Sequence, residues 1–158
     1  MTPQYNTSVS RGTKPAREWG MVTVEYATLP EWLDEVTVSF YVMAMMAKDG
    51  RNAYTLYRKD VTYLDVEQDR SHVADAYLLP SGLERFGQVV AVAVEITVKG
   101  ELVAQQSETA LRDALPVDWW KNEKVVKSEA VTIRDGYLLN RRESPFAFIN
   151  IDDYEAIK

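Results

Sequence analysis

The sequence contains no cysteine and only one histidine, His72. The absence of cysteine excludes disulfide bonds, thiol nucleophiles, zinc ribbons and iron–sulfur clusters. A single histidine cannot build the multi-ligand sites that transition metals usually occupy. The seven glycines are dispersed, so no glycine-rich loop that would cradle a phosphate is present. We therefore expect no cofactor, no metal site and no catalytic residue, that is, a protein that is not an enzyme.

Long apolar runs and clusters of basic side chains are also missing. No stretch approaches the roughly 20 apolar residues that a membrane-spanning helix needs. The formal net charge is −6 and the basic residues are scattered, which argues against nucleic acid as a partner. Residues 1–14 lack the apolar core of a signal peptide. Either the chain is not exported, or we expect its leader to precede residue 1.

The chain has 158 residues, of which 46% are hydrophobic. That length fits one domain with a core large enough to need no metal or disulfide. Residues 1–14 are polar and show no apolar period, so we expect a flexible N-terminal arm followed by one domain over residues 15–158.

Apolar residues alternate with polar ones in many short segments, the two-residue period of half-buried strands. Asp49-Gly50, Gly100 and Asp135-Gly136 are typical of tight hairpin turns. Strands are expected at residues 17–27, 35–47, 53–66, 72–79, 88–99, 101–107, 125–134, 137–141 and 146–151, with a helical turn at 80–87. The apolar positions change phase at residues 58–60, which predicts a bulge or a sheet-switching bend there.

This pattern predicts an all-β fold, an immunoglobulin-like antiparallel β-sandwich. Its alternating apolar residues form the expected core, which is listed here: Val38, Phe40, Val42, Val90, Val92, Val94 and Ile96.

Two local features are candidate binding surfaces. In the strand at 35–47, Tyr41, Met43 and Met45 add a second apolar face. Either another part of the chain covers this strip, with residues 146–151 as the candidate, or the strip is an interface for self-association or for a partner. Trp119 and Trp120 are adjacent and form either a stacking platform for a sugar or protein, or a cap on the core.

Acidic residues offer only weak signals. Asp65, Glu67 and Asp69 are spaced by two and would share one face of a strand, where they would offer oxygen ligands to calcium. They lack the glycine and terminal glutamate of an EF-hand loop. We expect a solvated, charged sheet edge instead.

The order of features is similar to that of a known family. The strand at 36–46, the Asp49-Gly50 turn and the turn at 80–87, which leads into the hairpin of residues 89–99 and 100–107, carry the similarity. Over residues 15–158 the chain resembles small immunoglobulin-like proteins linked to a type IV pilus-like gene cluster of a mucus-dwelling gut bacterium.

The resemblance implies an exported, non-enzymatic protein associated with the cell envelope or outer membrane. Its implied partners are other envelope or pilus-like proteins, or a second copy of itself, in adhesion or assembly. Two alternatives stay open: a carbohydrate-binding accessory module that uses exposed tryptophans, and a small hydrolase or isomerase that uses only carboxylates.

Overall fold

The computed structural model describes residues 4–5, 17–28, 31–68 and 71–158. The flexible arm expected at residues 1–14 lies outside the described residues, except for Gln4 and Tyr5. These two form β1 (Gln4–Tyr5), which pairs with β2 (Arg17–Glu18) in a separate two-stranded sheet.

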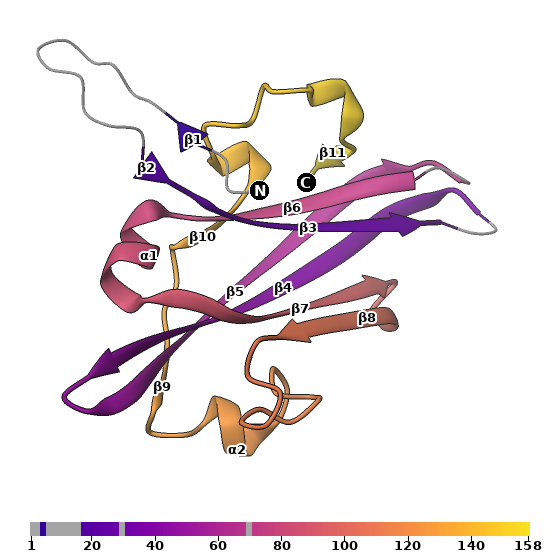
Figure 1. Cartoon of the computed structure of the whole chain (residues 1–158). Helices are drawn as coiled ribbons and strands as arrows, with labels where there is room; N and C mark the ends of the chain where they lie inside the picture. The colour runs from indigo at the N-terminus through magenta and orange to yellow at the C-terminus, as the bar shows by residue number, and fades with distance from the viewer. Residues whose placement is uncertain (1–3, 6–16, 29–30, 69–70) are drawn as a thin grey trace, which may run out of the picture.

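Two further sheets pack face to face and confirm the expected all-β sandwich (Figure 1). The larger sheet has the order β11-β5-β4-β7-β8, and β9 adds to β5. Its strands are β4 (Leu33–Lys48), β5 (Arg51–Val66), β7 (Gln88–Val98), β8 (Glu101–Thr109), β9 (Val131–Ile133) and β11 (Ala156–Ile157). The smaller sheet, of order β10-β6-β3, consists of β3 (Gly20–Ala27), β6 (Ser71–Leu78) and β10 (Leu138–Asn140).

The main core lies between the two sheets, on what we call the inner face of the larger sheet. Of the predicted core residues, five are fully buried there: Val38, Phe40, Val42, Val94 and Ile96. Val92 faces the same core but is only half-buried.

Val90 was predicted in this core, and that prediction is wrong. The register of β4 against β7 steps from Met43↔Ala91 to Ala44↔Val89, so Val90 is the extra residue of a β-bulge. It packs against the opposite, outer face of the larger sheet instead.

The long hairpin of β4 and β5 carries the turn expected from its sequence, because Asp49 and Gly50 both have positive φ. The bulge predicted at residues 58–60 is wrong: the β4–β5 register runs through them without a shift. The apolar phase changes because different faces of β5 are covered. Tyr54 and Leu56 pack on the outer face, whereas Val61 and Tyr63 pack on the inner face.

The short helix α1 (Pro80–Phe86) stands where a helical turn was expected and leads into β7. Gly87 follows it with φ +94, and a Cβ there would lie 2.0 Å from the carbonyl oxygen of Met45. Only glycine therefore lets the chain pass this close to β4.

Beyond residue 110 the sequence-based predictions fail more often. Residues 125–134 were predicted as one strand but form part of α2 (Glu123–Val126) and the short β9, which is parallel to β5. The hairpin predicted at Asp135-Gly136 is wrong, because the chain crosses there from β9 in one sheet to β10 in the other.

The strand predicted at residues 146–151 is also wrong. These residues form turns and the start of a 3₁₀ helix, η2 (Ile151–Asp153), which follows the earlier 3₁₀ helix η1 (Arg141–Glu143). Among the described residues, no helix is both long and apolar enough to cross a membrane.

Candidate functional site

The predicted tryptophan platform is not on the surface. Trp119 is 0% exposed and Trp120 6% exposed, with their rings edge to face at a centroid distance of 5.9 Å. Both lie in a second core cluster with Met43 and Leu56, on the outer face of the larger sheet. The expectation of exposed tryptophans that bind a carbohydrate is therefore wrong, and the rings cap the core.

The apolar strip of Tyr41, Met43 and Met45 is covered from within the chain. Met43 is fully buried beneath the tryptophans, whereas Tyr41 and Met45 are half-buried. The cover was expected from residues 146–151, but it comes from residues 115–131, the excursion that contains α2. The strip is an internal contact and not an exposed interface.

A carboxylate holds the edge of this second core together. Glu95 Oε1 accepts a hydrogen bond from the Trp120 indole nitrogen at 2.9 Å, and Glu95 Oε2 accepts one from the Tyr41 hydroxyl at 3.3 Å. Lys121 Nζ lies 3.4 Å from Glu95 Oε1. Burial, followed by the charge of Glu95, raises the pKa of Tyr41, which keeps its hydroxyl available as a donor.

The three acidic residues considered for calcium do not form a visible site. Asp65 is exposed and Glu67 half-buried, while Asp69 lies outside the described residues. Glu67 uses its backbone carbonyl oxygen to accept hydrogen bonds from Thr28 and from His72 Nε2.

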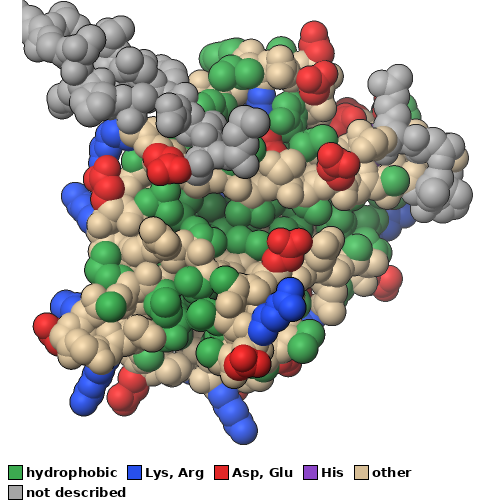
Figure 2. Space-filling model, in the orientation of Figure 1, with side chains coloured by type: hydrophobic (Ala, Val, Ile, Leu, Met, Phe, Trp, Pro, Cys, Tyr) green, Lys and Arg blue, Asp and Glu red, His purple; other side chains and the backbone are tan. Residues whose placement is uncertain are grey.

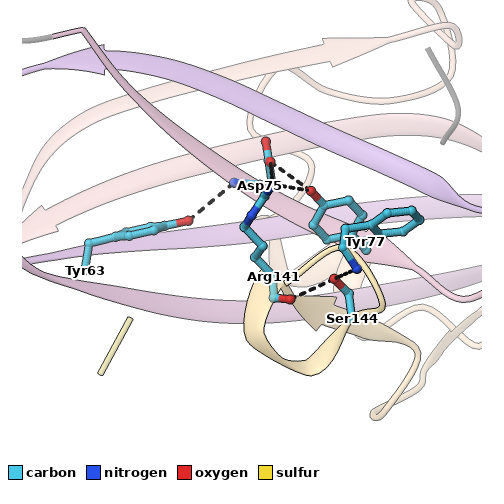
Figure 3. A network of polar contacts seen from close by, with 6 residues as sticks. Tyr63, Asp75, Tyr77, Arg141 and Ser144 are labelled. Carbon is cyan, nitrogen blue, oxygen red and sulfur yellow. Dashed lines mark hydrogen bonds and ion pairs between the residues drawn. The ribbon is translucent and has the colours of Figure 1, made fainter. Parts of the chain in front are cut away.

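An exposed apolar surface is formed by the C-terminal segment, and a buried ionic network lies at the start of this segment (Figure 3). Asp75 of β6 is buried and its Oδ2 lies 3.2 Å from the guanidinium nitrogen Nη1 of Arg141, which is also buried. The Tyr77 hydroxyl donates to the same Oδ2 at 2.9 Å and accepts from Arg141 Nη1 at 3.0 Å. Asp75 lies among apolar residues in the second half of β6, and this is the signal in the sequence that pointed to the network.

Burial, and then the negative charge of Asp75, raises the pKa of Tyr77 above its ordinary value. Tyr77 therefore remains a protonated donor throughout the physiological range. The ion pair is buried on both sides, so removing either partner would leave an unpaired charge in the core.

Arg141 anchors the segment that follows it. Its guanidinium carbon lies 3.6 Å from the centroid of the Tyr154 ring, and its carbonyl oxygen accepts a hydrogen bond from Ser144 Oγ at 2.8 Å. Phe146 stacks on Tyr77 at 4.9 Å and meets Trp19 edge to face at 5.5 Å. These contacts hold both ends of residues 141–154 against β6.

His72 provides a second attachment for the C-terminal segment. Its Nδ1 lies 3.1 Å from Glu155 Oε1, and its Nε2 lies 2.8 Å from the carbonyl oxygen of Glu67. Both ring nitrogens thus face acceptors, and the imidazole is almost fully buried. The single histidine of the sequence therefore lies in a structural contact.

The turns between these attachments expose apolar side chains. Phe148 is 85% exposed, Ile149 52% and Ile151 55%. Next to them lies a groove of ≈ 850 Å³, lined by Arg141, Arg142 and Tyr154 among others. We call Phe148, Ile149 and Ile151 the C-terminal surface. The sequence analysis missed it because the same apolar residues were interpreted as a covering strand.

Comparisons with known proteins found a similar solved structure and a matching protein family, each over nearly the whole chain. A crystal structure of a protein from Akkermansia muciniphila is similar, with a TM-score of 0.74 and 21% sequence identity, over 99% of this chain and 90% of that chain. At that identity the likeness shows the fold alone, and its source is a mucus-dwelling gut bacterium, as the sequence resemblance indicated. No curated protein matches significantly. A protein-family model matches the whole chain, residues 1–158, and the chain belongs to that family.

Proposed function

We propose that this protein is a non-catalytic component of a bacterial cell envelope that acts through contacts with other proteins. The C-terminal surface is the observation that carries the proposal. Three large apolar side chains within four consecutive residues are exposed, two of them line one groove, and such exposed apolar groups often mark protein-contact sites. The ionic network beneath them keeps the segment in one conformation, which lowers the entropy lost on binding.

The finer identity that we propose is an exported, immunoglobulin-like protein associated with a pilus-like assembly. Support comes from the full-length family match and from the fold shared with a protein of a mucus-dwelling bacterium. The role in this proposal is assembly or adhesion. The partners are other envelope or pilus-like proteins, so a chemical turnover is not required.

A photo-crosslinking experiment tests this proposal. A photoreactive phenylalanine analogue replaces Phe148 in the native host, and crosslinked partners are identified by mass spectrometry. We expect crosslinks to envelope proteins, including products of pilus-like genes. The matched control places the same analogue at Val117, which is 89% exposed but lies in the excursion on the outer face. Crosslinks restricted to cytosolic proteins, or equal products from both positions, would refute the proposal.

A further inference from the structure

The two sheets leave the inner face of the larger sheet partly uncovered. The smaller sheet ends at β3, which pairs only with β6 among the described residues, whereas the larger sheet continues past it through β7 to β8. Figure 2 shows a band of hydrophobic side chains open to solvent between β3 and β7, with acidic side chains on both of its borders. We call this band the seam.

Side chains that face the core are half-exposed along the seam. Val22, Val24 and Tyr26 are the inward residues of β3, and each is only half-buried, as is Val92 on β7. Their equivalents deeper in the sandwich, such as Val38 on β4, are fully buried. The seam is therefore a portion of the core that lacks a cover on one side.

Three cavities follow one another along β3 and show the same gap. Their volumes are ≈ 570, 300 and 460 Å³. The first two share Val22 and Val92, and the third continues past Tyr26 and Ile96. Together they run beside the full length of β3, which has 8 residues.

Within the described part of the chain, no strand pairs with the outer edge of β3, which is the condition for adding a strand. A strand placed about 4.8 Å from β3 would lie about 10 Å above β7 and β8, the usual distance between packed sheets. The edge strand of the larger sheet next to the seam, β8, is less suitable. Gln105, Gln106 and Glu108 make its second half polar, and its exposed apolar residues, Leu102 and Val103, lie at its start.

The charges that line the seam indicate which kind of polypeptide segment would bind there. The residues that line the three cavities include Glu18, Glu25, Glu84 and Glu108 but no lysine or arginine. Arg17 forms an ion pair with Glu84 at 2.6 Å, so Glu25 and Glu108 carry the charge argument. A second copy of this chain would bring the same glutamates to the seam, and like charges placed opposite each other are unfavourable. A basic partner is complementary instead.

We infer that the seam binds an extended segment of another polypeptide as an extra strand beside β3. Apolar side chains at every second position of that segment cover Val22, Val24 and Val92, and lysine or arginine at the positions between them lies beside Glu25 on the outward side of β3. The inference rests on the proposed function and deepens it, because it adds a second contact and states the chemistry of its partner.

Titration calorimetry on the full chain tests this with a defined probe. The probe is an end-capped peptide of eight residues, with valine at every second position and threonine or lysine between. We expect binding that weakens with salt, and at least about tenfold weaker binding when glutamate replaces lysine in the peptide. Absence of binding by the basic peptide would overturn the inference.

Two N-methylated versions of the probe separate strand addition from adsorption. In an added edge strand, only alternate amides donate to the neighbouring strand. Methylation of one alternate set of amides should therefore reduce affinity about tenfold or more, and methylation of the other set should be tolerated. Equal loss from both sets, or from neither, would overturn the inference.

Charge reversal places the site. Glu25→Lys with Glu108→Lys should weaken binding of the basic peptide about tenfold and favour the acidic one. The matched control, Glu123→Lys with Glu129→Lys, carries the same change on exposed residues outside the seam and should bind like the wild type. An equal loss in the control would show a general charge effect and would overturn the assignment.

Hydrogen exchange and sedimentation detect other occupants. In a monomeric sample, we expect the β3 amides that do not donate to β6 to become protected only when the peptide is added. Protection before addition, or a dimer that excludes the peptide, would show that this chain fills the seam itself. Such a failure would leave the proposed function standing, because the crosslinks from Phe148 test it independently.

Discussion

The two faces of the larger sheet are covered in different ways, and the coverage decides which apolar residues are free to bind. On the outer face, residues 115–131 close over Met43 and Leu56 with two tryptophans. On the inner face, the smaller sheet covers the central residues of β4 and β5 but leaves Val92 of β7 half-exposed along the seam. The outer face, which the sequence suggested as a binding surface, is covered. The inner face, which the sequence suggested as ordinary core, is partly exposed to solvent.

Aspartate substitutions on the inner face give the largest expected effect. Val38→Asp would bury a charge at a site that is 0% exposed and should cost at least about 4 kcal/mol, enough to unfold many domains of this size. Val92→Asp, at the half-exposed seam, should cost only about 1–2 kcal/mol. Urea melts of both variants measure the difference. An equal loss would mean that the seam is closed in solution.

The sequence anticipated the regular part of this comparison and missed the irregular part. Alternation located β4, β5 and β7 because a strand that is buried on one face shows a period of two in its own residues. Nothing local in the sequence states what covers the opposite face. Trp119 and Met43 are far apart in the chain, and their contact depends on how the excursion returns to the sheet.

The candidate surfaces were missed for the same reason. Residues 146–151 are apolar enough for a covering strand, but the network of Asp75 and Arg141 fixes the start of the segment, and turns expose Phe148. Val90 was assigned to the wrong face because one bulge inverts the direction of a side chain.

Truncation of a tryptophan tests the outer face. Trp119→Ala would open a cavity beneath residues 115–131 and should destabilise the protein by about 3–5 kcal/mol. Val117→Ala, in the same excursion but exposed, should stay within about 0.5 kcal/mol of the wild type. Chemical denaturation followed by circular dichroism measures both. A silent Trp119→Ala would indicate that the outer face is not a core.

The carboxylate at the border of the outer face should matter less. Glu95→Ala removes the acceptor of the Trp120 indole and of the Tyr41 hydroxyl, and should cost about 1–3 kcal/mol. Glu95→Gln keeps one acceptor oxygen and should cost about 1 kcal/mol or less. Thermal melts at low and high salt compare them. Both variants should be less sensitive to salt than the wild type, because neither attracts Lys121.

The smallest expected effect is a pH dependence that compares a tyrosine from each face. Burial raises the pKa of Tyr57, on the inner face, from 10.0 to about 12, so the folded state holds the phenol proton more tightly than the unfolded state does. The stability that this proton contributes is complete below pH 10 and is lost as the pH rises toward 12. At pH 10.5 the loss from Tyr57 should be less than about 1 kcal/mol.

Tyr57→Phe should reduce the difference between melts at pH 8 and pH 10.5, whereas Tyr41→Phe, at the half-exposed border of the outer face, should reduce it less. If Tyr41→Phe reduced this pH dependence more than Tyr57→Phe, the Tyr41 hydroxyl would be less accessible to water than the Tyr57 hydroxyl.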